Sequence, residues 1–232
     1  MEQSTLLTLD GLSVWYSPGK NVLDNFSLEL GDHEIVGLIG LNGAGKTTFI
    51  KTLSGLISSF QIGTARWHGA AFSFRDRTFK ENRYTVFAED HSFGHFTFRE
   101  YLSYAAASYG MKEPDFSELV RGFHFEDYVD VLLKELSTGN LKKAYLMTAF
   151  ALHPKLLLLD EPVNGLDFQS TEYLYELING YRQYGTILFS SHILESICLT
   201  SNRVLVLEQG RIRNTFTGPG INAETIREVL RE

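Results

Sequence analysis

The stretch Ile35-Val-Gly-Leu-Ile-Gly-Leu-Asn-Gly-Ala-Gly-Lys-Thr47 decides the fold of this chain. Its first five residues form a continuous apolar run, which is typical of a strand buried on both faces of a sheet. The run from Gly40 to Thr47 matches the phosphate-binding loop pattern and leads into a predicted helix that ends near Gly55. In such a loop, backbone N–H groups and the helix N-terminus surround phosphate groups, Lys46 reaches their oxygens, and the Thr47 hydroxyl ligates Mg²⁺. The strand–loop–helix context favours a nucleotide site over an ordinary glycine-rich turn with a solvated lysine.

A second apolar run, Leu156-Leu-Leu-Leu-Asp-Glu161, predicts another buried strand with two carboxylates at its end. Parallel sheets place ligands at the carboxyl ends of their strands. We expect Asp160 to hold Mg²⁺ and Glu161 to polarise an attacking water. Taken alone, this run would more often be a core strand with a solvated end, but the phosphate loop favours the catalytic interpretation. An Asn-Lys-x-Asp guanine-reading motif is absent from the sequence, which disfavours a GTPase.

The composition is that of a globular chain that does not bind nucleic acid. The 232 residues are 44% hydrophobic and 21% charged, with a net charge of -7, and this acidic balance argues against a broad basic surface. The single cysteine, Cys198, excludes a disulfide framework and fits a reducing compartment. The apolar runs are far shorter than the roughly 20 residues that span a bilayer. We therefore expect a soluble intracellular chain.

The order of predicted elements indicates an α/β fold. Alternating strand patterns occur at 7–16, with a bulge at Asp10-Gly11, at 26–30, and as a turn-linked pair at 64–73. After a helical middle, strands alternate with helices, at 156–160, 169–182, 186–190, 193–198 and 204–208. We expect a single domain over 1–232 with a P-loop NTPase core and a mostly parallel sheet. An N-terminal antiparallel β subdomain and an inserted helical subdomain at approximately 89–152 complete it.

Five segments, in this order, resemble the ATP-binding cassette (ABC) family. They are the phosphate loop, Leu136-Ser-Thr-Gly-Asn140, the strand ending in Asp160-Glu161, Asn164-Gly-Leu-Asp167, and Ser191-His192. The resemblance covers essentially the whole chain and is closest to the nucleotide-binding subunit of an ABC transporter, of the stand-alone kind that pairs with a separate membrane protein. It implies an ATPase that binds ATP and Mg²⁺ and forms ADP and phosphate.

The resemblance also implies roles for individual residues. Tyr16 would stack on adenine, with Trp15 as the neighbouring alternative. Ser137 and Gly139 would bind the γ-phosphate held by a second subunit, and Asp167 would organise the seam between them. The implied catalytic residues are Glu161, His192 and Glu89, and the metal ligands are Thr47, Asp160 and Glu89. The nucleotide-binding set is Tyr16, Asn42, Gly43, Ala44, Gly45, Lys46, Thr47, Thr48, Ser137, Gly139 and Asp167.

Two positions depart from the family pattern. Thr138 replaces a glycine in the signature segment (136–140), and its β-branched side chain restricts the backbone there. Glu89 stands where the family places a glutamine, and a carboxylate cannot donate a hydrogen bond to water. We expect a competent but slow ATPase.

The expected partners are an integral membrane transporter subunit and a second ABC subunit, in a homodimer or heterodimer, and no nucleic acid. This implies a cytoplasmic location, peripheral on the inner face of the cell membrane, and transport in the direction of export. Aromatic residues gather before and within the helical middle, and we expect most to be core and a minority to form a docking patch: Tyr84, Phe87, Phe93, Phe96, Phe98, Tyr101 and Tyr104. The basic run Arg75, Arg77, Lys80 and Arg83 is expected to be a solvated face.

Two alternatives stay open at this stage. One is a soluble ABC-type ATPase in assembly or nucleic-acid work, which the missing coiled-coil insertion and zinc-type cysteine set disfavour. The other is a slow-turnover regulatory or immunity cassette, which Thr138 and Glu89 keep open.

Overall fold

The computed structural model describes residues 4–231 and contains two sheets. The first sheet is antiparallel in the order β2-β1-β5-β6, with β4 paired to β1. In β1 the register shifts between Leu9 and Leu12, and Gly11 has a φ of 67°, so the predicted bulge is present. The strands are β1 (Thr5–Ser17), β2 (Lys20–Gly31), β4 (Phe60–Gln61), β5 (Thr64–Trp67) and β6 (Ala70–Ala71).

The second sheet is the centre of the fold, in the order β11-β10-β3-β9-β8-β7. Its pairs are parallel except for the edge strand β11, which runs antiparallel to β10. The predicted mostly parallel sheet is thus confirmed. Its strands are β3 (Ile35–Ile39), β7 (Arg83–Val86), β8 (Leu156–Asp160), β9 (Thr186–Ser191), β10 (Arg203–Glu208) and β11 (Arg211–Thr217).

The central sheet is apolar on both faces because two hydrophobic cores meet on it. Along β8, Leu157 and Leu159 join one core while Leu156 and Leu158 join the other, and all four are fully buried. Each such leucine contributes about 1.5–3 kcal/mol through burial. Helix α1 (Lys46–Leu53) packs into the core shared with the antiparallel sheet, and α5 (Thr138–Leu152) packs into the other. This layering explains why the sequence shows continuous apolar runs here rather than alternation.

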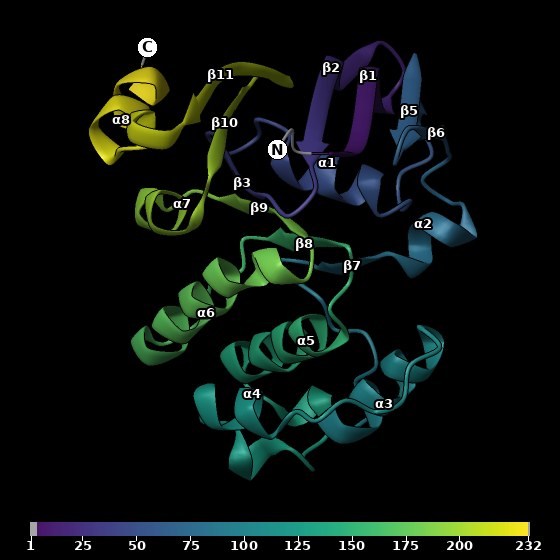
Figure 1. Cartoon of the computed structure of the whole chain (residues 1–232), viewed down its shortest axis with the longest axis vertical. Coiled ribbons are helices and arrows are strands. Elements are labelled where there is room, and N and C mark those ends of the chain that lie inside the picture. The colour runs from purple at the N-terminus through teal and green to yellow at the C-terminus, as the bar shows by residue number, and fades with distance from the viewer. Residues whose placement is uncertain (1–3, 232) are drawn as a thin grey trace.

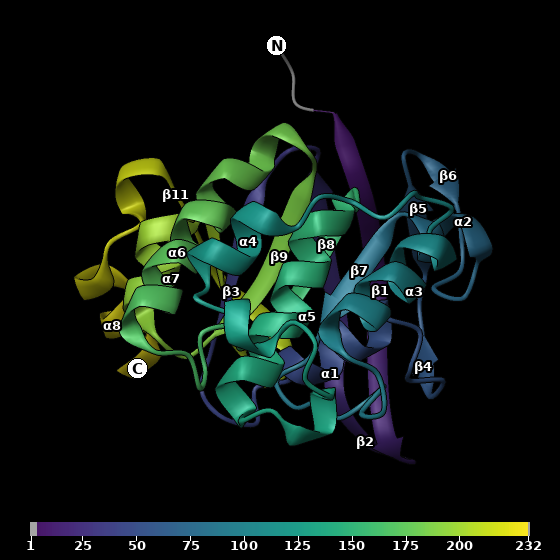
Figure 2. The same ribbon diagram turned by 90° about the horizontal axis from the view of Figure 1, so that it is seen from below.

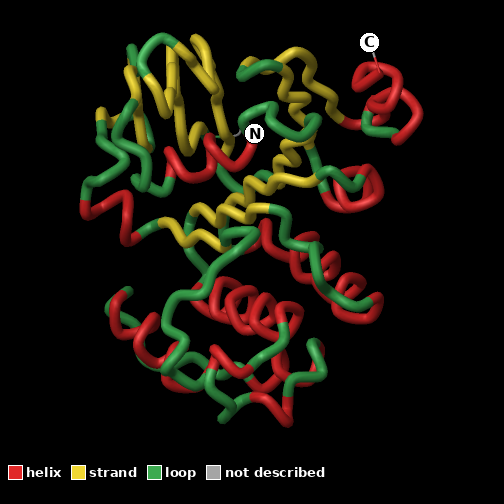
Figure 3. The backbone as a smooth tube through the Cα atoms, turned by 180° about the vertical axis from the view of Figure 1, so that it is seen from behind, coloured by secondary structure: helices red, strands yellow, loops and turns green. Residues whose placement is uncertain are grey.

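The helical middle forms the lower part of the molecule in Figure 1, and the antiparallel sheet forms the upper part. Seen from below, α5 of this segment lies in front of β8, and α3 lies to one side of it, near β7 (Figure 2). Figure 3 shows the same division from behind, with strands above and most helices below. The segment contains α3 (Phe98–Ser108), α4 (Ser117–Gly122), the 3-10 turns Glu126–Tyr128 and Leu133–Glu135, and α5.

The C-terminal part supplies α6 (Phe168–Gly180), the 3-10 turn Tyr181–Gln183, α7 (Leu194–Thr200), the 3-10 turn Gly218–Gly220 and α8 (Ala223–Arg231). Within the described residues, no helix combines the length and the apolar character needed to cross a bilayer.

The basic run is not wholly a solvated face, and that prediction was wrong for Arg83. This residue follows α2 (Arg77–Glu81), begins β7 and is buried. Its guanidinium donates hydrogen bonds to the Phe74 and Ser54 carbonyls and lies over the Phe79 ring. Burial lowers the pKa of Arg83 to about 10.

Candidate active site

The phosphate loop (Gly40–Thr47) connects β3 to α1, as the sequence predicts. Gly43 and Gly45 have φ values of 82° and 110°, a left-handed conformation that glycine adopts without steric cost. A Cβ added to Gly45 would lie 2.8 Å from Leu23 Cδ2, so a side chain would not fit there. The loop borders a pocket of about 470 Å³ lined by Val22, Asn42, Gly43, Ala44, Gly45, Lys46, Thr47, Thr48, Glu161, Asn164 and His192.

Lys46 occupies the floor of this pocket and is buried. Its Nζ donates to the Gly40 carbonyl at 2.7 Å and the Leu41 carbonyl at 3.4 Å, and lies 3.9 Å from Glu161 Oε1. Burial lowers the pKa of Lys46, and Glu161 and Asp160 oppose this by favouring the charged form. A buried ammonium that contacts mostly carbonyls can bind an anionic phosphate.

Asp160, at the end of β8, is only 1% exposed. Its Oδ1 accepts hydrogen bonds from Thr47 Oγ1 at 3.1 Å and Ser190 Oγ at 2.6 Å. Its Oδ2 is buried and has no hydrogen-bond partner among the described residues. An unsatisfied carboxylate oxygen is costly without a cation or donor, and carboxylate and hydroxyl oxygens suit Mg²⁺. The donor set therefore fits the metal that the resemblance implies.

Glu161 is the next residue and is held in an unusual backbone conformation, with a φ of 49°. Its N–H donates to both the carbonyl and the hydroxyl oxygen of Ser190, which stabilises this conformation. Its Oε2 lies 2.7 Å from His192 Nδ1 and accepts a hydrogen bond from the His192 N–H at 3.2 Å. The structure thus brings together two residues that the sequence assigned separately to catalysis.

Tyr16 lies beside the phosphate loop, with its hydroxyl 3.2 Å from Thr48 Oγ1. The side chain is 61% exposed, so the ring is open to stacking from solvent. Trp15 is half-buried, and its backbone N–H donates to the Ser59 carbonyl. Of the two aromatic candidates, Tyr16 is therefore the one with the exposed ring next to the loop.

The signature segment leads into α5. Ser137 is exposed and caps this helix, with its hydroxyl accepting a hydrogen bond from the Asn140 N–H. A Cβ on Gly139 would lie 2.5 Å from the Gly165 carbonyl, so only glycine permits this close approach of two loops. Asp167 caps α6 and pairs with Lys143 Nζ at 2.8 Å. Ser137, Gly139 and Asp167 do not line the pocket at the phosphate loop.

Glu89 is also outside that pocket. It is exposed and lines a separate pocket of about 190 Å³, together with Thr138 and Lys142. The two departures from the family pattern, Glu89 and Thr138, therefore share one small cavity. Sequence reasoning missed Ser190 and the buried lysines Lys142 and Lys143. Two adjacent lysines inside an otherwise apolar helix are the signal that could have identified the lysines.

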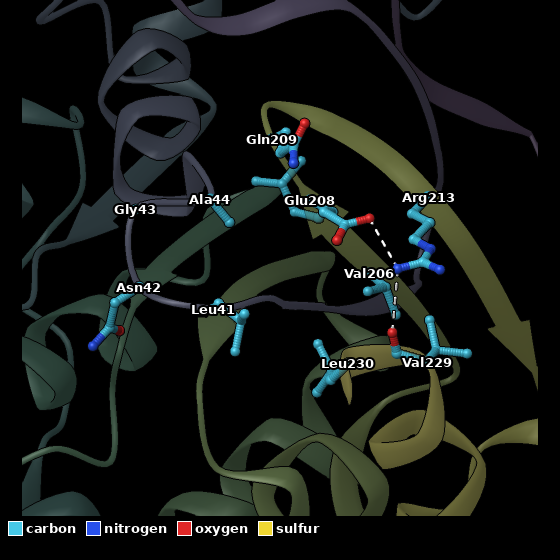
Figure 4. A pocket seen from close by; sticks show the side chains of 11 residues that line it. Leu41, Asn42, Gly43, Ala44, Val206, Glu208, Gln209, Arg213, Val229 and Leu230 are labelled. Atoms are coloured by element: carbon cyan, nitrogen blue, oxygen red, sulfur yellow. Dashed lines mark hydrogen bonds and ion pairs between the residues drawn. The ribbon is translucent and has the colours of Figure 1, made fainter. Parts of the chain in front are cut away.

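A third pocket, of about 230 Å³, lies between the phosphate loop, β10 and α8 (Figure 4). Leu41, Ala44, Val206 and Leu230 give it apolar walls. Arg213 closes one side, with its Nη1 3.0 Å from Glu208 Oε2 and 3.5 Å from the Val229 carbonyl (Figure 4).

The fold and this constellation define a P-loop ATPase. The family model described as "ABC transporter" matches residues 23–164. The chain is 35% identical over 222 residues to the "Putative ABC transporter ATP-binding protein AlbC" of Bacillus subtilis (strain 168), covering 91% of this chain and 92% of that protein. It is 30% identical over 217 residues to the "Cobalt import ATP-binding protein CbiO" of Rhodobacter capsulatus, covering 89% and 77%.

A solved structure described as "Structure of ATP binding subunit of ABC transporter" superposes with a TM-score of 0.84, at 30% identity, over 98% of this chain and 95% of that one. The chain belongs to the ABC transporter family, as an ATP-binding subunit with ATPase activity.

Proposed function

We propose that this chain hydrolyses ATP to drive transport through a separate membrane-spanning partner. The observation that carries the proposal is the Glu161–His192 pair, at 2.7 Å, beside the buried ammonium of Lys46 and the unpartnered Oδ2 of Asp160. A base, an orienting histidine and a phosphate-binding cation within one pocket are what phosphoryl transfer to water requires.

Residues of the phosphate loop bind the triphosphate through backbone N–H groups of the loop and of the first turn of α1. Lys46 pairs with the β- and γ-phosphate oxygens. Glu161 accepts a proton from the attacking water, and His192 orients the Glu161 carboxylate and contacts the γ-phosphate. Thr47 and Asp160 hold Mg²⁺, which when bound neutralises charge on the phosphates. Tyr16 stacks on adenine.

The proposed site is completed by a second ABC subunit, either the same chain or a different cassette. Ser137 and Gly139 bind the γ-phosphate held by that subunit, and Asp167 organises the seam. Support comes from the exposure of Ser137 and from its position outside the pocket at Lys46. Two-fold symmetry would build two equivalent sites from one sequence.

Glu89 is the proposed sensor of the γ-phosphate and an additional metal ligand. It lies on the segment between β7 and α3, which leaves the sheet edge next to β8. A carboxylate attracts Mg²⁺ and repels the phosphates, so these effects partly cancel. We expect Glu89→Gln to retain or raise turnover, because Gln supplies an N–H donor to water, and Glu89→Ala to lower it. If both variants match the wild type, Glu89 is not the sensor.

An aromatic patch on the helical segment is the proposed docking site for the membrane subunit. Phe93 is 40% exposed and Tyr104 50% exposed, and their ring centroids lie 5.3 Å apart and 5.6 and 5.8 Å, respectively, from that of half-buried Phe96. Phe98 and Tyr101 are buried, so most of the aromatic cluster is core and a minority is free. Exposed aromatic groups of this kind mark protein interfaces.

The proposed domain is a single ABC ATPase unit over 1–232 with its helical subdomain at approximately 89–152. It lies in the cytoplasm, peripheral on the inner face of the membrane through its partner, and does not bind nucleic acid, which its net charge of -7 disfavours. The proposed direction is export. The relatives do not decide the direction, because one of them is named for cobalt import.

Steady-state hydrolysis by the purified chain, with Glu161→Gln as the blank, tests the activity. Co-purification from detergent-solubilised membranes tests the partner. Turnover equal to the blank would favour the regulatory cassette, and turnover without a membrane protein would favour the soluble ATPase. Uptake into inside-out vesicles, rather than into right-side-out cells, would support export.

A further inference from the structure

Lys142 is a charged side chain inside the protein that the proposed chemistry does not use. It lies on α5, two residues after the signature segment, and is only 4% exposed. Its Nζ donates to the Phe87 carbonyl at 2.6 Å and to the Ala88 carbonyl at 2.8 Å. Both acceptors lie just after the end of β7, where the chain has left the sheet.

We infer that Lys142 is a positioning residue that locks the segment Phe87–Ser92, here called the switch segment, to the first turns of α5. The inference rests on the proposed function, because it gives that segment's Glu89 a fixed place relative to the signature segment.

The geometry of the two hydrogen bonds fixes a peptide plane. The Ala88 carbonyl belongs to the peptide group whose N–H is that of Glu89, so holding this carbonyl and the preceding one orients the backbone at Glu89. An ammonium has three donors, and two of them are used on consecutive carbonyls. The far end of the switch segment has a second link to the same helix, since Tyr145 donates to the Ser92 carbonyl at 2.6 Å.

The surroundings explain why a lysine serves here. Burial lowers the pKa of Lys142 to about 8, and carboxylates that face it oppose this shift: Asp160, Asp90, Glu161 and Glu89. Lys142 is therefore within electrostatic reach of acidic residues of the active site and of the switch segment. A buried ammonium is expensive, and an apolar residue of similar size is often neutral or stabilising at such a position. A lysine that only filled space would be a poor choice there.

The two hydrogen bonds of Lys142 couple the movement of the switch segment to that of α5. A shift of α5 would therefore move the switch segment with it. Glu89 and Thr138 line the same cavity as Lys142. The next residue, Lys143, links the same helical turn to Asp167 at 2.8 Å and to the Phe123 carbonyl at 3.1 Å. Adjacent lysines thus tie one helix to two loops of the proposed shared site.

The test compares Lys142→Met with Lys142→Arg and with the matched control Tyr145→Phe, which removes a hydrogen bond from the other end of the switch segment. Limited proteolysis of the full-length chain, without nucleotide, reads the link, because loss of the bonds to the Phe87 and Ala88 carbonyls frees the backbone of the segment for cleavage. We expect the rate of cleavage within residues 87–92 to rise about tenfold in Lys142→Met and to stay near wild type in Lys142→Arg. An unchanged cleavage rate in Lys142→Met would overturn the inference, whether or not the chain hydrolyses ATP.

Turnover supplies the functional readout. Loss of a charged hydrogen bond corresponds to about a tenfold change, so we expect kcat of Lys142→Met to fall about tenfold while KM for ATP stays within twofold. Lys142→Arg should recover at least half of the turnover, and Tyr145→Phe should remain within twofold. Thermal unfolding separates this from a packing defect, because Lys142→Met should be at least as stable as wild type. If the cleavage rate rises but kcat does not change, Lys142 ties the segment without affecting turnover, and its positioning role for the reaction is wrong.

Discussion

Around the phosphate loop, polar side chains from different elements already touch one another, whereas the proposed nucleotide contacts of the helical segment face solvent. Lys46, Asp160 and Glu161 are joined by direct contacts and by Ser190, and the first two are buried. Ser137 and Glu89 are exposed and line no common pocket with Lys46. The comparison indicates that one half of the proposed site is preorganised in a single chain, and it supports the proposal that the other half acts on a partner.

The structural cause of this difference is the central sheet. Asp160 and Glu161 follow a fully buried strand, and paired strands on either side of it fix their backbone. The signature segment begins a helix, and its polar end projects beyond the core that holds the rest of α5. Preorganised polar groups need not rearrange during the reaction, so the residues at the edge of the sheet are suited to catalysis. The exposed residues of the helical segment are suited to recognition of a partner.

The largest expected effect comes from breaking the preorganised half at Glu161. Glu161→Gln retains the shape and the hydrogen bond to His192 but removes the base. We expect turnover to fall by about 10²–10⁴-fold, with ATP binding retained. Phosphate release in steady state and nucleotide titration measure the two quantities. Asn164→Ala, in the same pocket, is the control, and an equal loss there would remove the special role of Glu161.

A smaller effect is expected in binding when Lys46 is replaced. Lys46→Ala leaves the phosphate charge without its ammonium, and we expect affinity for ATP to fall about ten- to a hundredfold. Calorimetric titration with ATP and Mg²⁺ measures it. Lys51→Ala, a lysine in the last turn of the same helix, is the control and should bind as wild type. Wild-type affinity in Lys46→Ala would contradict the assignment of the loop.

Substitutions in the helical half should weaken association with the membrane protein and leave ATP hydrolysis nearly unchanged. Phe93→Ala and Tyr104→Ala are expected to leave ATP hydrolysis by the isolated chain within about twofold, because the rings lie outside the pocket, and to weaken co-purification with the membrane protein. Leu199→Ala, exposed on α7, is the control and should do neither. Unfolding of the Phe93 or Tyr104 variants would instead mean that these rings are core.

The smallest effect concerns the pH dependence of stability at Asp167. The hydrogen bond from Lys143, followed by that from the Ser170 N–H, holds the pKa of Asp167 well below its usual range. A carboxyl whose pKa is depressed in the folded state stabilises the fold at pH values above its pKa in the unfolded chain, which is about 3.9. This contribution is lost as the pH falls toward the lower pKa of the folded state. Asp167→Asn keeps the helix cap but loses the charge, so we expect a deficit of about 1 kcal/mol at neutral pH.

Urea unfolding of wild type and Asp167→Asn at pH 7 and pH 3 measures the difference. The deficit should shrink at the lower pH. Asp130→Asn, which breaks the exposed pair with Arg99, serves as the comparison for a simple surface ion pair. If Asp167→Asn loses the same free energy of unfolding at both pH values, the loss arises from packing and not from the carboxylate charge.

The preorganised half was also the more predictable from sequence, for a physical reason. The phosphate loop and Asp160-Glu161 each follow a continuous apolar strand, so their place at the sheet edge is a local property of the chain. The Glu161–His192 contact was not predicted, because it depends on the parallel pairing of β8 with β9. Ser190, which bonds both Asp160 and Glu161, gave no signal beyond its position before His192.

The errors and omissions lie where burial depends on tertiary packing. Arg83 belongs to a charged run that is typical of a surface, yet its guanidinium is buried over the Phe79 ring, where backbone carbonyls accept its hydrogen bonds. Lys142 and Lys143 are buried for the same kind of reason. A sequence pattern records the charge of such side chains but not the distant carbonyls that satisfy them.

The central claim is that the second half of the site comes from another copy or cassette. Light scattering of Glu161→Gln at saturating ATP and Mg²⁺ tests it most directly, because this variant should bind nucleotide and stop before cleavage. We predict a mass twice that of the chain, returning to the single-chain mass when ATP is omitted or when Ser137→Arg is added. A single-chain mass with ATP bound, in a protein whose wild type alone hydrolyses ATP, would contradict the account.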